Sequence, residues 1–569
     1  MKSDILKLIP QPQKCVEENG FLKNRKVKIS FDNIDNRIRN VLKKLPIGKD
    51  GIELKIEVRD TDEESYELKI RENQILINAD GIRGAFYAVQ TLRQIFENDV
   101  IPYCTISDKP DFKYRGIYLD ITRGKVPKLE TIKKIIDKIA YMKINSLQLY
   151  VEHTYEFKEY TDSIGRTGYI TAEELQELDA YCKDNFIDFI PSIATFGHLY
   201  ELLSKDRYRH LCVLDDFKQE RHLWNERLQH HTIDPLNPES IELIKSLIDQ
   251  YSPNFTSEWF NICCDETFDL KNGKHKDKNT GELYINFVQE ILEHLGKKGK
   301  KVMMWGDVLR DHPDQIDKLP KDVLLLNWYY RPNPARERVS SFHDAGRKQI
   351  LTTSTWTFYN FTENLNLSLP NITDMSSLGY EYKVEGILNS IWGDYGHTAS
   401  IELTECGVAY GADRSWNVKA DVNAIWGKLD KLIYKAEGLS GYLKELNEIQ
   451  GKMTWLSFFN LYSNMYYKTA LHLYSDYSKE ALLEVQKACE DFRNRLEKEF
   501  YNNAYKTQML LAAEAIQVMC ELVGINTGVN IARRTNTKEW LMKYRQSWLE
   551  SNKESELTEI EKIFLAMEK

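Results

Sequence analysis

The feature that most constrains the fold is an alternation of short apolar runs and amphipathic stretches between residues 111 and 405. Short apolar runs are typical of strands buried on both faces, and apolar residues at helical spacing between them indicate helices. The predicted strands are 116–121, 146–151, 188–194, 260–264, 301–305, 323–328, 349–355 and 386–392. The clearest predicted helices are 129–142, 172–185, 238–251 and 282–296. Eight such strand–helix units predict a (β/α)8 TIM barrel, which usually takes about 250 residues.

The segments that flank the predicted barrel have different patterns. Before it, residues 27–31, 52–58 and 66–70 alternate polar and apolar side chains, as half-buried strands do. After it, five stretches read as amphipathic helices, namely 424–436, 455–473, 480–499, 505–523 and 538–551. We therefore expect a small α+β domain at 1–110, the barrel at 111–405, and an all-α C-terminal domain at 406–569. Packing on the barrel or homodimerisation is the expected role of that last domain.

Composition narrows the classes of partner. The formal net charge is −9 and no long basic run occurs, which argues against nucleic acid as a partner. Residues 1–10 lack the apolar core of a signal peptide, and we expect no stretch that crosses a membrane. The nine cysteines are scattered without a Cys-x-x-Cys motif, as is typical of reduced thiols. These features predict a cytoplasmic protein without a cofactor or a metal.

Polar and aromatic residues gather at the predicted strand ends, where a barrel of this kind carries its active site. The fourth strand runs directly into Asp265 and Glu266. The other polar residues near strand ends are Arg115 before the first strand, Glu152 and His153 after the second, His198 after the third, and Asp394 after the eighth. The tryptophans at these ends are Trp305, Trp328, Trp356 and Trp392. A ring of indoles beside carboxylates suits a sugar, because pyranose faces are apolar while pyranose edges carry hydroxyls.

Glycoside cleavage needs an acid that protonates the leaving oxygen and a group that stabilises an oxocarbenium-like centre. Glu266 is the expected acid, because a carboxyl in a tryptophan-lined pocket keeps its proton nearer neutrality. Asp265 is its direct neighbour, whereas a retaining enzyme with a carboxylate nucleophile places its two carboxyls about 5–5.5 Å apart across the sugar. Asp265 therefore fits better as the partner of a 2-acetamido group whose own carbonyl oxygen attacks the anomeric carbon.

With these residues the sequence resembles glycoside hydrolase family 20, the β-N-acetylhexosaminidases. Asp265 and Glu266 match the acid pair of that family, and residues 114–120 together with Arg123 resemble its first-strand motif. Residues 196–198 resemble its Pro-Gly-His turn with Phe in place of Pro, and residues 392–394 resemble its Trp-x-Glu motif with Asp in place of Glu. Residues 84–92 are similar to the small domain that precedes the barrel in the family. Residues 261–264 depart from its His-x-Gly-Gly, and residues 151–152 from its Asp-Asp.

The resemblance implies an exo-acting, retaining enzyme that removes terminal β-linked GlcNAc or GalNAc through an oxazolinium intermediate. Its substrate would be a small oligosaccharide or glycoconjugate. Asp265 and Glu266 would be catalytic, Arg115 would hold ring hydroxyls, and Tyr359 would donate to the acetamido oxygen. The expected substrate-binding residues are Arg115, Glu152, His198, Trp305, Trp328, Trp356, Tyr359, Trp392 and Asp394.

Two alternatives stay open at this point. The first is a barrel glycosidase with a conventional carboxylate nucleophile drawn from Glu152, Asp307 or Asp394. The second is a sugar-binding protein without catalytic activity on the same barrel. The intact acid pair argues against the second.

Overall fold

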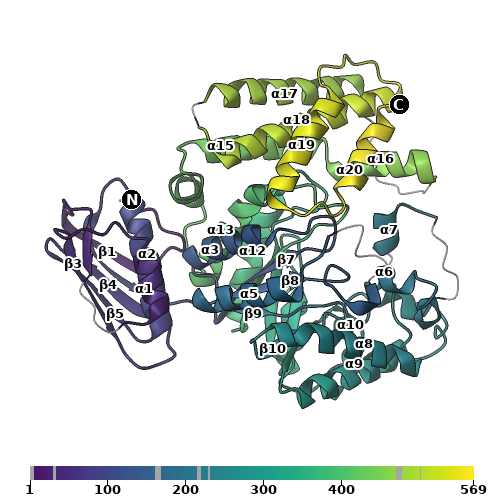
Figure 1. Cartoon of the computed structure of the whole chain (residues 1–569), viewed down its shortest axis with the longest axis horizontal. Coiled ribbons are helices and arrows are strands. Elements are labelled where there is room, and N and C mark those ends of the chain that lie inside the picture. Colours follow the sequence, from purple (N-terminus) through teal and green to yellow (C-terminus); the bar gives the residue numbers. More distant parts are fainter. Residues whose placement is uncertain are drawn as a thin grey trace.

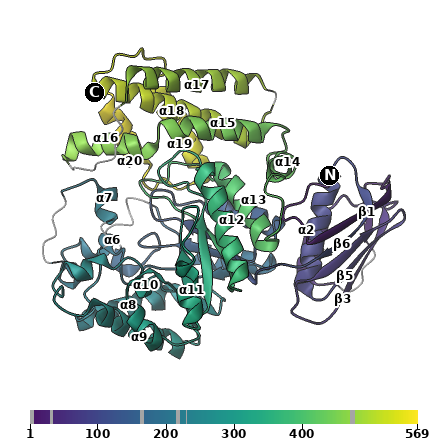
Figure 2. The ribbon, with the colours of Figure 1, turned by 180° about the vertical axis from the view of Figure 1, so that it is seen from behind.

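The structure is a computed structural model that describes residues 6–29, 34–160, 168–214, 220–228, 231–468, 477–499 and 501–569. Three parts follow one another along the chain (Figure 1). The N-terminal domain, in purple, lies on one side of the barrel. The helical C-terminal part, in light green and yellow, covers another side of the barrel, and the view from behind has the same arrangement (Figure 2).

In its described residues, 6–29 and 34–110, the N-terminal domain has one six-stranded sheet and two helices. Its strands are β1 (Lys14–Phe21), β2 (Val27–Ile29), β3 (Ile52–Val58), β4 (Tyr66–Ile70), β5 (Gln74–Ala79) and β6 (Pro102–Asp108), in the sheet order β1-β6-β4-β5-β3-β2. The helices α1 (Asn36–Leu42) and α2 (Ile82–Glu97) pack on each other, and α2 also contacts β4 and β5. Within β4, alternate residues are buried, which confirms the predicted half-buried strand at 66–70.

The central part is a sheet of eight parallel strands that closes into a barrel. These strands are β7 (Tyr114–Asp120), β8 (Ser146–Tyr150), β9 (Asp188–Ile190), β10 (Trp259–Asn261), β11 (Lys301–Trp305), β12 (Leu324–Trp328), β13 (Gln349–Ser354) and β14 (Gly386–Ile391). Their order is β10-β11-β12-β13-β14-β7-β8-β9. The sheet closes between β9 and β10, where the Asn261 N–H donates to the Pro191 carbonyl at 2.8 Å and Ser192 bridges to Asn261. The predicted barrel, with all eight strands, is confirmed.

Strand β10 ends three residues earlier than the pattern predicts, and this early end creates the space for the acid pair. Cys263 and Cys264 adopt left-handed conformations with φ of 56° and 61°, which no strand tolerates. The Asn261 side chain supports this turn, because its Oδ1 accepts from the Cys263 N–H at 2.9 Å. Apolar composition could not reveal the turn, since both cysteines are buried as strand residues would be.

Helices cover the outside of the barrel. They are α3 (Leu129–Tyr141), α5 (Ala172–Asp184), α8 (Pro238–Tyr251), α9 (Thr280–Lys297), α10 (Asp307–Asp311), α11 (Glu337–Asp344), α12 (Leu365–Glu381) and α13 (Glu405–Trp416). Local start signals place some of them: Thr171 and Glu174 form a reciprocal capping box at α5. The long segment between β9 and α8 carries the short helices α6 (Tyr200–Leu203) and α7 (Leu223–Arg227) within its described residues.

The C-terminal part is helical, as predicted. Its helices are α14 (Ile425–Lys428), α15 (Leu439–Lys452), α16 (Trp455–Tyr467), α17 (Lys479–Lys498), α18 (Ala504–Thr527), α19 (Thr537–Ser551) and α20 (Leu557–Met567), with a π-helical turn at Leu429–Tyr434 after α14. The prediction at 455–473 extends beyond α16, and residues 469–476 lie outside the described residues.

Helix α18 is an exception to the expectation that no stretch is apolar enough to cross a membrane. By length and composition it is long and apolar enough to do so. However, 78% of its most apolar window is buried inside the structure, and α15, α16, α17, α19 and α20 all contact it. Its apolar composition is therefore accounted for by its place at the centre of the helical domain.

Candidate active site

The two acidic residues that follow β10 point to the same place. Glu266 has a left-handed conformation with φ of 49°, so the chain curls at this point instead of alternating faces as a strand would. Gly197 lies directly against the curl: a Cβ atom there would come within 2.5 Å of the Asp265 carbonyl oxygen. The glycine is thus required by close approach, and the next residue, His198, is brought beside both acids.

His198 joins the two carboxylates. Its Nε2 lies 3.2 Å from Oδ2 of Asp265 and 3.4 Å from Oε2 of Glu266. Burial disfavours the charged imidazole, but the negative charge of Asp265 and the hydrogen bonds to both acids outweigh it and raise the pKa of His198 to about 10. At neutral pH the acid pair therefore faces an imidazolium.

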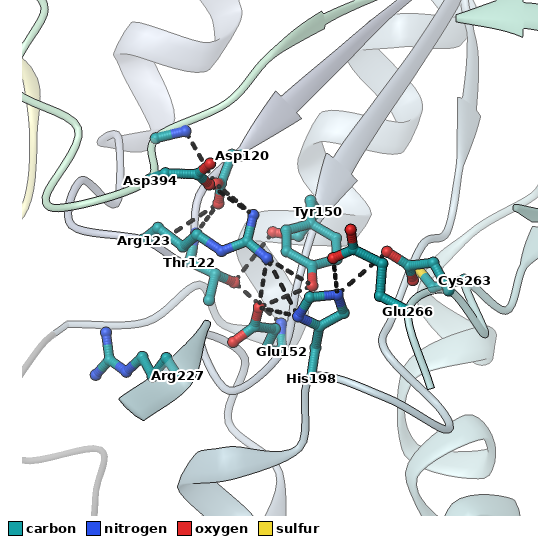
Figure 3. A network of polar contacts seen from close by, with 12 residues as sticks. Asp120, Thr122, Arg123, Tyr150, Glu152, His198, Arg227, Cys263, Glu266 and Asp394 are labelled. Atoms are coloured by element: carbon teal, nitrogen blue, oxygen red, sulfur yellow. Dashed lines mark hydrogen bonds and ion pairs between the residues drawn. The ribbon is translucent and has the colours of Figure 1, made fainter. Parts of the chain in front are cut away.

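Arg123 is the centre of the polar network on the other side of His198 (Figure 3). Its guanidinium lies 3.1 Å from Oδ1 of Asp394, 3.2 Å from Oε1 of Glu152 and 3.5 Å from Oδ2 of Asp120. Burial raises the pKa of Asp394 to about 6 although Arg123 opposes the rise, and burial likewise raises the pKa of Glu152. Arg123 therefore lies within ion-pair distance of three carboxyl groups, and its charge favours the ionised forms of Asp394 and Glu152 against the effect of burial.

The four predicted tryptophans belong to one aromatic cluster at this end of the barrel. Trp305 and Trp392 are almost fully buried, and each packs on the ring of Tyr118 with 5.2 Å between centroids. Trp328 stacks on Tyr330 at 5.2 Å. The Trp392 indole N–H donates to the Tyr330 hydroxyl at 2.9 Å, and the Trp356 indole N–H donates to the Tyr330 carbonyl. Tyr330, which was not predicted from the sequence, therefore ties three of the four indoles together.

Tyr359 lies beside the same cluster, in a left-handed conformation with φ of 74°. Burial raises the pKa of its hydroxyl, and the carboxylates of Asp394 and Glu266 are among the neighbours that raise it further. A phenol in these surroundings keeps its proton and acts as a hydrogen-bond donor. The structure thus brings Tyr359 into the neighbourhood of the predicted acid.

Comparison with known proteins agrees with this geometry. Residues 112–387 match the model of the glycosyl hydrolase family 20 catalytic domain, and residues 6–109 match that of glycosyl hydrolase family 20, domain 2. The chain belongs to glycosyl hydrolase family 20.

Two curated relatives in family 20 are distant in sequence and longer than this chain. A β-hexosaminidase of Porphyromonas gingivalis is 28% identical over 285 residues, which is 43% of this chain and 36% of the relative. A lacto-N-biosidase of Bifidobacterium bifidum is 24% identical over 325 residues, which is 54% of this chain and 26% of the relative. The matched region thus spans well under two thirds of either relative.

Solved structures of family 20 proteins share the fold. The chitobiase of Flavobacterium johnsoniae superposes with a TM-score of 0.62 at 20% identity, and the match covers 100% of both chains. The exo β-N-acetylglucosaminidase of Vibrio harveyi, solved in complex with N-acetylglucosamine, gives 0.60 at 20% identity over 78% of each chain. At 20% sequence identity, these matches show that the fold is shared and nothing more about this chain.

Arg115 is the predicted site residue that the structure places elsewhere. It stands near the start of β7, at the end opposite the acid pair, and it is completely buried. Its guanidinium donates to Glu64 at 2.8 Å and to Tyr87 at 3.2 Å, both in the N-terminal domain. The expectation that Arg115 holds ring hydroxyls is therefore corrected: this arginine links two domains. Arg123, in the same family 20 motif but just past the end of β7, is the arginine at the site.

The geometry also raises the question of whether the acid pair and His198 bind a metal ion. His198, Asp265 and Glu266 each offer a ligand atom, and these atoms lie within 4.8 Å of one another. A histidine must be neutral to bind a metal. The raised pKa of His198 favours the imidazolium as the partner of the acids instead, although the positive charge of Arg123, 3.4 Å from its Nδ1, opposes that protonation.

Asp307 contacts the backbone of the acid pair. It is the first residue of α10, and its Oδ2 accepts from the Glu266 backbone N–H at 2.9 Å. Burial, together with the nearby charge of Asp265, raises the pKa of Asp307 to about 7. An unfolded carboxyl of this type has a pKa of 3.8.

Replacing Asp307 with Asn is expected to change the pH dependence of stability. Between pH 3.8 and about 7 the unfolded wild type has released a proton that the folded protein still holds. The free energy of unfolding of the wild type therefore falls over this window as the pH rises, by at most about 1.4 kcal/mol per pH unit. Asp307→Asn lacks this titration. Its Tm relative to wild type should rise across the window and stay level above about pH 7.

Thermal unfolding of both proteins at several pH values between about 4 and 9 measures this difference. A difference in Tm that does not change with pH would contradict the buried, protonated Asp307.

Proposed function

We propose that this protein is an exo-acting, retaining β-N-acetylhexosaminidase that removes terminal β-linked GlcNAc or GalNAc with participation of the substrate acetamido group. One observation carries the proposal: two adjacent carboxylates, Asp265 and Glu266, meet on the single imidazole of His198. A pair so close together suits one acid and one amide partner better than an acid and a nucleophile on opposite faces of a sugar. The β-hexosaminidases among its relatives support the choice of substrate class.

In the first step, Glu266 donates its proton to the glycosidic oxygen as the bond from that oxygen to the anomeric carbon breaks. The acetamido carbonyl oxygen of the substrate forms the new bond to the anomeric carbon. The amide nitrogen then carries positive charge in an oxazolinium ring, and Asp265 accepts the N–H and balances that charge. Tyr359 donates its O–H to the acetamido oxygen and so orients it.

In the second step, water attacks the anomeric carbon from the side that the leaving group vacated. Glu266, now a carboxylate, removes a proton from this water, and the bond to the acetamido oxygen breaks. The amide is restored and the acid is protonated again. Two inversions at the anomeric carbon leave the product with the β configuration of the substrate.

The other site residues fit sugar binding. Arg123 and the carboxylates of Asp394 and Glu152 form an array of donors and acceptors that suits the hydroxyls of a terminal ring. Of the four tryptophans, the partly exposed Trp328 and Trp356 offer apolar surface for the pyranose face, and the more deeply buried Trp305 and Trp392 belong to the same cluster. Hydrogen bonds from such an array to several hydroxyls of one ring suit a non-reducing terminal sugar, as exo action requires.

A thiazoline that mimics the oxazoline tests the proposal. It resembles the cyclic intermediate, so it should inhibit at least about 100-fold more tightly than the substrate binds. Hydrolysis of a chromogenic N-acetyl-β-glucosaminide, with and without the thiazoline, provides the measurement. Indifference to the thiazoline, together with a covalent adduct after incubation with a 2-fluoro sugar, would instead support a carboxylate nucleophile.

A further inference from the structure

The helical C-terminal domain touches the loop that carries Asp394. Trp455, the first residue of α16, is fully buried, and its indole N–H donates to the Tyr395 carbonyl at 2.7 Å. Tyr395, Gly396 and His397 follow Asp394 with φ of 60°, 97° and 49°. Successive left-handed residues are unfavourable, so such a loop persists only where its surroundings hold it.

The same turn of α16 holds the loop that carries Tyr359. The backbone N–H of Leu456 donates to the Tyr359 carbonyl at 3.1 Å. The ring of Phe361, two residues further on, packs against Trp455 with 5.9 Å between centroids. The loops that follow β13 and β14 are therefore both bonded to the first turn of α16, through Leu456 and Trp455 respectively.

A second contact runs from the helical domain to the mouth of the barrel. Glu556, between α19 and α20, is buried, and its carboxylate accepts from the Trp224 indole N–H at 2.7 Å and pairs with Arg227 at 2.5 Å. Both partners belong to α7, and Figure 3 places Arg227 beside the polar network. The Trp224 indole packs so closely on Gly396 that a Cβ there would lie 2.4 Å from it. Glu556 therefore binds α7 in the position where Trp224 packs on Gly396, in the loop after β14 that Trp455 also contacts.

Glu556 also reaches the loop after β7. Its backbone N–H donates at 3.3 Å to the carbonyl of Gly124, the residue after Arg123. Gly124 has a φ of 114°, and a Cβ at this position would meet the Gly396 carbonyl oxygen at 2.3 Å. The backbones that bear Arg123 and Asp394 are therefore in direct contact, and the helical domain holds both.

From these contacts we infer that Trp455 and Glu556 are positioning residues of the hydrolase site, so that the helical domain is part of the catalytic architecture. This inference rests on the proposed function, because that proposal defines the reaction that the site performs. Trp455 and Glu556 act through the loops that set the ion pair of Arg123 with Asp394 and the position of the Tyr359 hydroxyl.

Trp455→Phe tests the first of these residues. It removes one N–H donor and keeps an aromatic ring. Trp540→Phe is the matched control, because Trp540 is equally buried and its indole N–H donates to the Leu511 carbonyl at 3.1 Å within the helical domain. Because a misplacement of about 1 Å can cost about 100-fold in rate, we expect Trp455→Phe to lower kcat/KM at least about tenfold. Trp540→Phe should stay within about twofold of wild type at a similar Tm.

Glu556→Gln tests the second residue against Glu561→Gln. The control loses an ion pair with Arg545 that lies wholly within the helical domain, at 3.0 Å. The first variant leaves Arg227 buried with one partner fewer, so α7 should shift and kcat/KM should fall at least about tenfold. If either test variant matches its control in kcat/KM, the positioning role of that residue is overturned.

Amide hydrogen exchange tests the inference independently of activity. Trp455→Phe should speed exchange in peptides that cover residues 357–363 and 393–399, whereas Trp540→Phe should leave both unchanged. Unchanged exchange in Trp455→Phe would overturn the inference even if the protein is an active hexosaminidase. If the wild-type protein hydrolyses no N-acetylhexosaminide, the proposed function is wrong. The hydrogen-exchange result would still show whether Trp455 fixes the two loops.

Discussion

Glu266→Gln is expected to lose about 10²- to 10⁴-fold in kcat on substrates with poor leaving groups, because a positioned general acid contributes about that much. On aryl glycosides whose leaving phenol is acidic, the loss should be far smaller in the first step, since such a phenol departs without a proton. Release of the sugar should then be slow, because Glu266 also activates the attacking water. The rates of natural-type disaccharides and of aryl glycosides with phenols of graded acidity, measured on one preparation, provide the test.

Glu258→Gln is the matched control for this prediction. Glu258 precedes β10 at the opposite end of the barrel and is well exposed, with a surface ion pair to Lys301. Its replacement should leave kcat and Tm close to wild type, since surface ion pairs contribute about 0–1 kcal/mol. A Glu266→Gln protein with the activity of Glu258→Gln on a disaccharide would remove Glu266 from the acid role.

Asp265→Asn is expected to lower kcat/KM on N-acetylhexosaminides by about 10²- to 10³-fold, the usual effect of removing one group that stabilises charge in a transition state. The amide of Asn can still accept from the substrate N–H, but it cannot balance the positive charge of the oxazolinium. The thiazoline should lose affinity in parallel with the rate, because it carries the same ring. Steady-state kinetics and inhibition constants on the same variant measure both.

Asp317→Asn serves as the control for Asp265→Asn, since Asp317 is almost fully exposed on the outside of the barrel. The Asp265 variant should fold as the control does, which circular dichroism and Tm establish. If Asp265→Asn hydrolyses the substrate at the wild-type rate, or if it loses rate while the thiazoline binds as before, the acetamido-orienting role is wrong.

The barrel could be predicted from sequence because a strand buried on both faces has an apolar run that few other elements share. Strand β11 begins and ends where the pattern at 301–305 predicts. Helix α12 was harder to see, since serine, asparagine and threonine interrupt its apolar spacing and Pro370 lies inside it. The limits of β10 could not be predicted, because left-handed cysteines leave no trace in an apolar pattern.

The acid pair and the indole cluster could be predicted because strand ends are easy to place. The same rule favours Arg123 over Arg115, because Arg115 lies near the start of β7 and Arg123 just past its end, where the C-terminal ends of the strands face the site. The contacts of the helical domain with Tyr359 and Tyr395 could not be predicted. They join residues about 60–100 positions apart, and in both the acceptor is a backbone carbonyl, which carries no residue-specific signal.

The measurement that tests the central claim most directly compares two chromogenic substrates that differ only at C2 of the sugar. One carries the acetamido group and the other a hydroxyl. Because the hydroxyl sugar has no internal nucleophile and leaves Asp265 without its partner, the acetamido sugar should be favoured in kcat/KM by about 10⁴-fold or more. Equal rates on the two sugars, within about tenfold, would contradict acetamido participation and, with it, the roles proposed for Asp265 and Glu266.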